Sequence, residues 1–442
     1  MVERHNLNQE KNMNKNYRVI WNYAQQCYVV ASELARGKVK SSRSGKTANK
    51  ASFISGALGS ALLLAASPAA LASDHGALVN GPEDKLELSN QTLKATGNDH
   101  YGLLVQNGGQ ASATEVTVLN DGNNGYGVVA SRTGTLNLDG TRVETTGQAG
   151  YGAYASSAGI INSLNADYVT HGDSAHGAYS RATGSLIDLT GGSVTTGGAK
   201  AYGLFAGSGG QLNASDVQVS TSGDQSYAVM ATDKGSELTM TGGKVTTTGT
   251  KAYGLAAGSG SKLSASGVQV NTSGDQSNGV TANNAGTEVN LDNSTFETTG
   301  ASAFGLYAGS ASTLNASNVQ VTTVGKNAHG GYVTGEGSVL NVDNSAFLVS
   351  GAGANGLTAE SQSALNASDS SIKVTGSGMG VLASGTGTVL NLFDSQIVTG
   401  PDALNAVCAR YCSTANIKNI DIITDAKKRS CAGFRFLRDN EC

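Results

Sequence analysis

A column of asparagines is the first candidate for surface chemistry in this sequence of 442 residues. The asparagine follows the first apolar residue of a short alternating run and recurs about every 25 residues. The members are Asn137, Asn162, Asn213, Asn290, Asn315, Asn341, Asn366 and Asn391, with Thr239 and Ser264 in the same phase. Because each lies between two apolar residues, we expect it to face outward, where stacked amides form a hydrogen-bonded ladder. Such a ladder predicts either reinforcement of the surface or a face for self-association.

Aspartate is the second residue type here whose placement has a chemical meaning. Five aspartates fall at the turn expected after the second apolar run of a repeat: Asp139, Asp216, Asp292, Asp343 and Asp394. Aspartate in a turn bonds nearby backbone amides, and we expect that role. Calcium binding is the alternative, but the dense Gly and Asp spacing of a calcium-binding nonapeptide repeat is missing.

Histidines and carboxylates show no arrangement that favours catalysis. His176 and His329 occupy a column in which other repeats have Tyr, Asn, Phe or Met, and neither has a set of metal ligands nearby. We expect both to pack at the solvent-facing surface rather than bind metal. A polysaccharide-cleaving site would need a cluster of carboxylates or basic residues outside the repeat phase. The sequence shows none, so it predicts no catalytic residue, no metal site and no cofactor.

These side chains are positioned by a repeat whose clearest copy is YGLFAGSGGQLNASDVQVSTSGDQS, from Tyr202 to Ser226. Its opening dipeptide recurs, intact or altered, at Tyr101, Tyr126, Tyr151, His176, Tyr202, Tyr227, Tyr253, Asn278, Phe304, His329, Asn355 and Met379. Successive copies are 24 to 26 residues apart. A fixed period of that length, rich in Gly, Ser, Thr and Asn, is typical of a solenoid.

Three apolar alternations separated by turn residues predict three short strands in each repeat. Leu204 and Ala206 stand for two columns that are nearly always apolar, so both are expected to face inward. Equivalent strands of successive coils must pair in parallel. The sequence therefore predicts an all-β, right-handed, single-stranded parallel β-helix over residues 101–407, with about 12 coils of roughly 25 residues.

The coils alternate in two types, which predicts how the interior is filled. One type has a small residue in the second strand and two valines after it, as in LNASDVQVSTSG around Ala214. The other has a large residue there and one large apolar residue in the third strand, as in LTMTGGKVTTTG around Met240. Since interiors are filled to near-crystalline density, large and small residues are expected to offset each other within each coil.

Charge is distributed unevenly along the chain. Residues 1–50 hold 10 Lys and Arg against 3 acidic residues, and residues 51–407 hold 12 against 26. Phosphate binding requires clustered Lys or Arg, so the acidic body argues against nucleic acid as a partner.

The N-terminal region has the order of a secretory signal. Basic residues up to Lys50 precede the apolar stretch 52–66 and a small-residue site ending at Ala72. This order predicts cleavage between Ala72 and Ser73. A transmembrane anchor is the alternative, but the apolar run is short for one.

Upstream of that signal, the stretch MNKNYRVIWN (13–22) and, further on, SELARG (32–37) resemble the extended signal peptide region of large Gram-negative proteins secreted by type V routes. The resemblance implies an extended signal peptide over residues 13–72, with residues 1–12 as an upstream artefact. The repeats in turn resemble the passenger domains of pertactin-like and self-associating autotransporters.

The flanks of the repeat body are predicted separately. Residues 73–100 form an N-terminal segment that caps or begins the first coil. Residues 408–442 lose the repeat phase, become basic and hold Cys408, Cys412, Cys431 and Cys442. A four-cysteine zinc site would need two close pairs, and only Cys408 and Cys412 are close, so zinc is not favoured. A frameshift or truncation is the favoured explanation, since a passenger is expected to continue into an outer-membrane β-barrel that this chain lacks.

Three functions are compatible with the sequence. The resemblance implies a secreted or cell-surface passenger that acts as an adhesin or self-association module, exported through the inner-membrane Sec translocon. Its partners are expected to be a host cell or matrix surface, or like passengers on neighbouring cells. The alternatives are a polysaccharide-acting enzyme on the same fold and a non-functional, truncated fragment in the periplasm.

Overall fold

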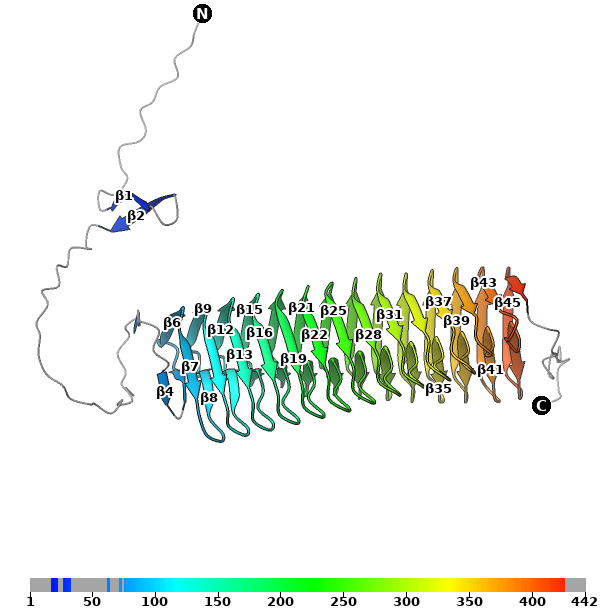
Figure 1. Cartoon of the computed structure of the whole chain (residues 1–442), viewed down its shortest axis with the longest axis horizontal. Helices are drawn as coiled ribbons and strands as arrows, with labels where there is room; N and C mark the ends of the chain where they lie inside the picture. Colours follow the sequence, from blue (N-terminus) through cyan, green and yellow to red (C-terminus); the bar gives the residue numbers. More distant parts are fainter. Residues whose placement is uncertain (1–16, 23–26, 33–61, 64–70, 74, 426–442) are drawn as a thin grey trace, which may run out of the picture. The chain divides into compact units, whose positions relative to one another are not determined.

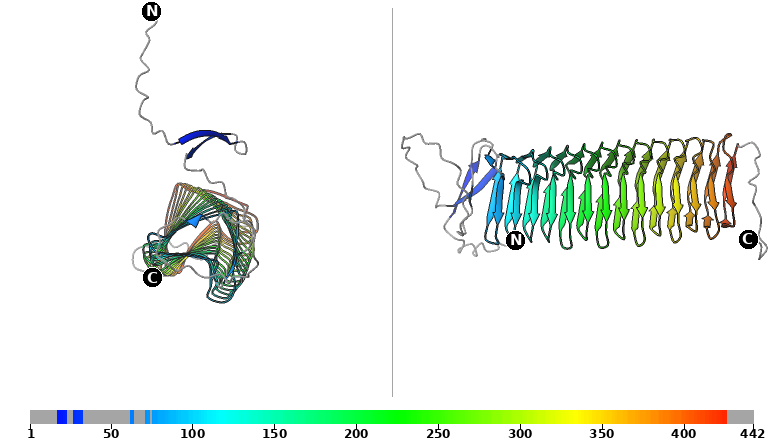
Figure 2. Two further views of the ribbon diagram at one scale, coloured as in Figure 1. Left: turned by 90° about the vertical axis from the view of Figure 1, so that its left-hand side faces the viewer. Right: turned by 90° about the horizontal axis from the view of Figure 1, so that it is seen from below.

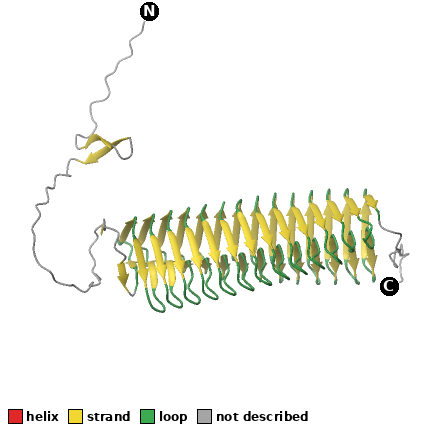
Figure 3. Cartoon of the chain, in the orientation of Figure 1, coloured by secondary structure: helices red, strands yellow, loops and turns green. Residues whose placement is uncertain are grey.

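The computed structural model describes residues 17–22, 27–32, 62–63, 71–73 and 75–425. The chain divides into two units, Met1–Leu58 and Gly59–Cys442. All described secondary structure is β-strand, with no helix that could span a membrane in those residues (Figure 3).

In the first unit, two strands form an antiparallel hairpin, β1 (Tyr17–Asn22) with β2 (Cys27–Ser32). Residues 1–12, predicted to be an upstream artefact, lie outside the described residues.

The second unit consists of three long sheets, built from strands that recur in order along the chain (Figure 1). The first sheet has 14 strands and opens each coil. Its strands are β5 (Ala77–Asn80), β8 (Tyr101–Gln106), β11 (Tyr126–Ser131), β14 (Ala153–Ser156), β17 (Ala178–Arg181), β20 (Leu204–Gly207), β23 (Val229–Thr232), β26 (Leu255–Gly258), β29 (Val280–Asn283), β32 (Leu306–Gly309), β35 (Gly331–Thr334), β38 (Leu357–Glu360), β41 (Val381–Ser384) and β44 (Val407–Arg410).

The second sheet has 15 strands and carries the asparagine column. Its strands are β3 (Leu62–Leu63), β6 (Lys85–Ser89), β9 (Gln110–Thr114), β12 (Thr135–Asp139), β15 (Ile160–Leu164), β18 (Leu186–Thr190), β21 (Gln211–Ser215), β24 (Glu237–Thr241), β27 (Lys262–Ser266), β30 (Glu288–Asp292), β33 (Thr313–Ser317), β36 (Val339–Asp343), β39 (Ala364–Ser368), β42 (Val389–Phe393) and β45 (Thr414–Lys418).

The third sheet also has 15 strands and closes each coil. Its strands are β4 (Leu71–Ser73), β7 (Thr92–Ala95), β10 (Thr117–Asn120), β13 (Arg142–Thr145), β16 (Asp167–Thr170), β19 (Ser193–Thr196), β22 (Gln218–Thr221), β25 (Lys244–Thr247), β28 (Gln269–Thr272), β31 (Thr295–Thr298), β34 (Gln320–Thr323), β37 (Ala346–Val349), β40 (Ser371–Val374), β43 (Gln396–Thr399) and β46 (Asp421–Thr424).

Every strand of the solenoid pairs in parallel with its equivalent one coil away, so like residues stack over like. Asn137 pairs with Asn162, for example, and Leu204 with Val229. Viewed along the stack, the coils superpose around one interior (Figure 2). The prediction of an all-β parallel β-helix with three strands per coil is confirmed. Its right hand stays a prediction.

The coil number was predicted slightly too low. The first sheet opens 14 coils, two more than predicted. The added coils are formed by β5–β7 before residue 101 and by β44–β46 after residue 400. The first opens with His75-Gly76 and the last with Asn405-Ala406. Both keep the strand alternation, which decides the pairing of strands.

The expectation that the repeat phase is lost after residue 407 is wrong for residues 408–424. Strands β44–β46 pair in register with the preceding coil, Leu392 with Ile417 and Ile397 with Ile422. Ile417 is nevertheless 39% exposed and Ile422 is 47% exposed, because no described coil stacks on them. Cys408 and Cys412 are disulfide-bonded, and residues 426–442 lie outside the described residues.

The interior is one apolar cluster that runs through the coils. Leu204 and Ala206 are fully buried, as expected for the two inward columns of the first sheet. Small Ala214 accompanies two buried valines, and large Leu291 accompanies the single buried Phe296. The predicted offset of large and small residues within a coil is therefore confirmed.

A glycine in the third turn sets how closely the coils stack. A Cβ on Gly223 would overlap the backbone carbonyl of Gly198, and one on Gly249 would overlap that of Gly223. Backbone cannot move aside as a flexible side chain does. Glycine is therefore required wherever one coil presses this closely on the next.

The predicted cleavage site lies inside a strand of the third sheet. Leu71–Ser73 form β4, which pairs with β7, so the bond between Ala72 and Ser73 is part of a ladder in the uncleaved chain. The cleavage itself stays a prediction.

Candidate functional site

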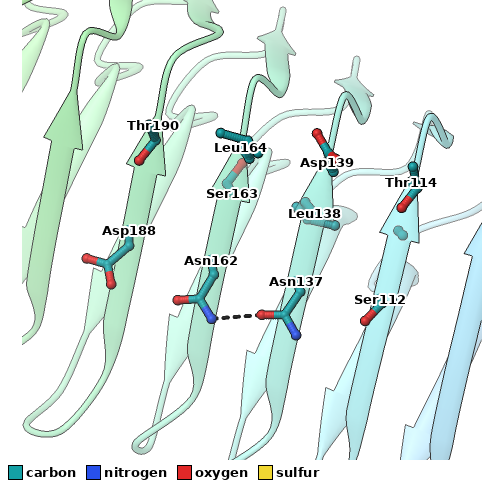
Figure 4. A pocket seen from close by; sticks show the side chains of 11 residues that line it. Ser112, Thr114, Asn137, Leu138, Asp139, Asn162, Ser163, Leu164, Asp188 and Thr190 are labelled. Atoms are coloured by element: carbon teal, nitrogen blue, oxygen red, sulfur yellow. Dashed lines mark hydrogen bonds between the residues drawn. The ribbon is translucent and has the colours of Figure 1, made fainter. Parts of the chain in front are cut away.

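The asparagine column forms a side-chain ladder on the outer face of the second sheet. Asn162 Nδ2 donates to Asn137 Oδ1 at 2.8 Å, and Figure 4 shows both side chains on neighbouring strands with Asp188 next in line. The column faces outward because its neighbours in each strand, such as Leu136 and Leu138, are buried. Each amide has both a donor and an acceptor, so one residue type can continue the ladder indefinitely.

The longest unbroken run of this ladder lies in the last six coils. Each of five asparagines donates from Nδ2 to Oδ1 of the asparagine one coil earlier, over 2.6–2.8 Å. The six members are Asn290, Asn315, Asn341, Asn366, Asn391 and Asn416. Thr239 and Ser264 separate this run from the earlier one, because their short side chains carry no amide.

Two members of the column were missed from the sequence. Asp188 takes an asparagine position and accepts a hydrogen bond from Asn213 Nδ2 at 2.6 Å. Asn416 donates to Asn391 at 2.8 Å, but its coil had been assigned to the non-repeat tail. Both stand in phase with the column, so counting by position rather than by residue type would have found them.

Two shallow depressions follow the same face, with volumes of about 390 and 360 Å³. The first includes Asn137, Asn162 and two carboxylates, Asp139 and Asp188. The second crosses the gap at Thr239 and Ser264 and reaches Asn290 and Asn315. The face is thus a polar surface of amides, hydroxyls and a few carboxylates, open along the axis of the stack.

The expected role of the turn aspartates is wrong for three of the five. Asp292 accepts hydrogen bonds from the side chains of Asn293 and Asn318, Asp343 from Ser368, and Asp394 from Asn419. In a parallel in-register stack, turn side chains of the next coil lie close to an outward turn residue. The partners are therefore side chains instead of backbone amides.

Backbone capping by aspartate occurs at the third turn instead. Asp173 Oδ1 accepts from the backbone N–H of Ala199, Asp224 from Thr250 and Asp275 from Ala301, each at 2.8 Å. These aspartates link one coil to the next and are structural.

A second ladder, made of aromatic rings, follows the start of the first-sheet strands. Neighbouring rings lie 4.7–5.6 Å apart between centroids, and most are nearly parallel. The ring stack comprises His75, Tyr101, Tyr126, Tyr151, His176, Tyr202, Tyr227 and Tyr253. A shorter row of Tyr154, Tyr179 and Phe205 lies beside it. The tyrosines are half-buried.

His176 does not face solvent as expected, whereas His329 is partly exposed. His176 is 8% exposed between the rings of Tyr151 and Tyr202, and its Nδ1 accepts the backbone N–H of Tyr202 at 3.0 Å. His329 accepts from the N–H of Asn355 in the same way, at 2.8 Å. Burial lowers the pKa of His176 to about 3 and that of His329 to about 4, so both are neutral acceptors.

Asparagine replaces histidine as the acceptor of a backbone N–H where the ring stack is interrupted. Asn278 Oδ1 accepts the backbone N–H of Phe304 at 2.8 Å, while its Nδ2 donates to Thr281 Oγ1 at 3.1 Å. Asn355 and Thr358 repeat this arrangement. The paired Asn-x-x-Thr spacing in these two coils is the signal for it in the sequence.

The described residues contain no group of three or more His, Cys, Asp or Glu side chains that could hold a metal ion. The candidate sites are therefore the two outward ladders. As binding sites, the asparagines of the amide ladder stay a prediction.

Comparison with known proteins decides the route of export. Residues 13–66 match the family model described as the extended signal peptide of the type V secretion system. The segment is a type V secretion signal. It covers the two stretches whose resemblance was noted in the sequence, so the chain is an exported protein and the type V assignment is confirmed.

A solved structure with the same fold is the cryo-EM structure of the Vag8–C1 inhibitor complex. A chain in it is 18% identical with a TM-score of 0.55, over 81% of this chain and 92% of that one. Two further matches are 10% identical: tailspike protein 3 of bacteriophage CBA120 (TM-score 0.31, 78% of this chain and 57% of that one) and the A-module of an Azotobacter vinelandii mannuronan C-5 epimerase (0.30, 78% and 91%). Those two scores are too low to support an argument. A search of curated proteins found no match.

Proposed function

We propose that this type V-secreted chain is a non-enzymatic surface passenger that acts as an adhesin or self-association module. The observation that carries the proposal is the unbroken amide ladder from Asn290 to Asn416 on an outward sheet face. A regular row of amides offers the same donor and acceptor in every coil. Such a surface suits a partner that is itself repetitive, namely a second passenger, a matrix polymer or a glycan-covered host cell.

Two further observations support binding over catalysis. The depressions on this face are shallow and open to solvent along the stack, as expected of a surface that meets a large partner. Vag8, with which this chain shares the fold, is seen in a complex with C1 inhibitor. A protein of this fold can therefore bind another protein.

The test is display of residues 73–442 on Gram-negative cells through a heterologous membrane barrel, with clumping and attachment to matrix-coated surfaces as readouts. Replacing Asn315, Asn341 and Asn366 with alanine is expected to reduce clumping or attachment at least tenfold. The matched control replaces Gln218, Gln269 and Gln320, exposed residues of the third sheet, and is expected to leave both unchanged. Equal loss in the two variants would contradict the assignment to the second sheet.

An enzyme acting on polysaccharides is the second candidate, because Asp139 and Asp188 line one depression. Paired carboxylates are the catalytic groups of glycoside hydrolases. Cleavage of a polysaccharide panel that is lost in Asp188→Asn would favour the enzyme. The proposal expects no cleavage by either chain.

A further inference from the structure

Three pairs of stacked rings in the ring stack each consist of two tyrosines, whose hydroxyl groups are not required for stacking. The centroids of Tyr126 and Tyr151 lie 4.7 Å apart with ring planes 8° from parallel. Tyr227 lies 5.1 Å from Tyr202 at 3° and 4.7 Å from Tyr253 at 8°. Phenylalanine would stack as well, yet these positions carry phenols, and all five tyrosines are partly exposed.

Two phenols held in this way are arranged for oxidative coupling. A phenoxyl radical bears part of its unpaired electron on the carbons ortho to the oxygen, and coupling needs two such carbons within reach. Because the coils stack in register, equivalent rings of neighbouring coils lie face to face, and coupling requires the two side chains to tilt until their ortho carbons meet.

We propose that Tyr126–Tyr151, Tyr202–Tyr227 and Tyr227–Tyr253 are sites at which a haem peroxidase and hydrogen peroxide form dityrosine cross-links between adjacent coils. Each hydroxyl loses one electron and one proton. The two radicals pair their electrons in a new carbon–carbon bond, and the two ortho protons move to the oxygens. Two phenols and one hydrogen peroxide give one dityrosine and two water molecules.

The surroundings of the other aromatic residues distinguish them from these pairs. Tyr168 is 1% exposed, and its hydroxyl is hydrogen-bonded to Ser163 at 2.9 Å inside the core. Tyr332 donates its hydroxyl to Glu360 at 2.8 Å, and the tyrosine on which it stacks, Tyr307, lies 5.9 Å away between centroids, farther than in the three pairs. Burial raises the pKa of Tyr227 to about 12, so its proton is still present at neutral pH and must leave together with the electron.

Such links would take the place of disulfide bonds, which the solenoid body cannot form. No cysteine occurs between residues 28 and 407, so disulfides cannot join these coils. A dityrosine forms only after folding has stacked the strands, and thiols do not reverse it. It would fix neighbouring coils to each other outside the cell.

The test is treatment of the full-length folded chain, at low concentration, with horseradish peroxidase and hydrogen peroxide. The proposal expects blue dityrosine fluorescence and, on peptide mapping by mass spectrometry, linked peptides of the three pairs, each lighter by two hydrogen atoms than its parts. Links found only between chains, links at Tyr168 in preference to the pairs, or no dityrosine at all would overturn it.

Variants locate the links without removing the stack. Tyr227→Phe keeps the ring and is expected to lower the yield at least twofold, leaving Tyr126–Tyr151 as the main product. Tyr253→Phe is expected to remove only the Tyr227–Tyr253 peptide. Tyr411, 71% exposed, supplies the control: Tyr411→Phe is expected to change nothing. An unchanged yield in Tyr227→Phe would contradict the assignment.

Discussion

The two outward ladders reinforce different parts of the solenoid. The ring stack is unbroken from His75 to Tyr253 and then stops at Asn278. The amide ladder is unbroken from Asn290 to Asn416, after the gap at Thr239 and Ser264. The N-terminal coils are thus reinforced mainly by rings on the first sheet, and the C-terminal coils by amides on the second.

The ladders differ in how much sequence change they tolerate. Stacked rings gain from buried area and ring contacts, so Tyr, His and Phe are interchangeable as long as a flat side chain remains. An amide ladder depends on directional hydrogen bonds, so a residue without both a donor and an acceptor interrupts it. The ring column accordingly varies in residue type, whereas the amide ladder from residue 290 onward is entirely asparagine.

Removing one ring from the middle of the stack is expected to have the largest effect. Tyr202→Ala should lower the free energy of unfolding by about 2–3 kcal/mol, since two neighbouring rings lose a face contact and area is exposed. Tyr202→Phe should cost less than about 0.5 kcal/mol. Chemical denaturation of the two variants measures the difference, and equal losses would show that the hydroxyl, instead of the ring, is what matters.

Lowering the pH should destabilise the coils of the ring stack but not the amide ladder. The pKa of His176 falls from an ordinary 6.5 to about 3 on folding, so its contribution is complete above pH 6.5 and is lost as the pH falls toward 3. At pH 5 the loss is about 2 kcal/mol relative to neutral pH. Hydrogen bonds from Arg142 and His171 lower the pKa of Glu144. Its contribution to stability is therefore lost only at a lower pH than that of His176.

The control for this acid effect is His176→Asn, which copies the acceptor that Asn278 supplies elsewhere in the column. It should reduce the change in denaturation midpoint between pH 7 and pH 5. An unaltered pH dependence would mean that His176 is not the group that titrates.

Interrupting the amide ladder is expected to cost less. Asn341→Ala removes a donor to Asn315 and an acceptor for Asn366, which should lower the free energy of unfolding by about 1–2 kcal/mol. Urea denaturation measures this change in the free energy of unfolding. No loss would mean that water replaces both bonds without cost.

The smallest effect is expected at the end of the shorter amide run. Asn137→Ala removes the acceptor of Asn162 alone and should cost about 0.5–1 kcal/mol. If Asn137→Ala lowered the free energy of unfolding as much as Asn341→Ala, the hydrogen bonds of the ladder would not contribute separately to stability.

Much of the fold could be predicted because the repeat itself carries the register. The columns of Leu204 and Ala206 fixed which side chains face inward, and the alternation of Ala214 with Met240 showed how the coil is filled. The first coil was interpreted as a cap, and the last was missed because its opening, Asn405-Ala406, has diverged. Leu86 and Ile422 nevertheless keep the strand alternation in these two coils.

The candidate site was harder to predict where contacts run between coils. The outward direction of the asparagines follows from alternation, but the buried position of His176 depends on rings from the coils before and after it. The partners of Asp292 are Asn293, the next residue, and Asn318, in the following coil. Such contacts appear only when the coils are stacked in three dimensions.

The central claim is that equivalent residues lie directly over one another in successive coils. The cysteine-free body allows a direct test by engineered disulfides, which need Cα atoms about 4.4–6.8 Å apart. Cysteines at positions 315 and 341, one coil apart, should oxidise rapidly within the chain, whereas cysteines at 315 and 366, two coils apart, should not. Rapid closure of the second pair, or none of the first, would contradict the stacked solenoid.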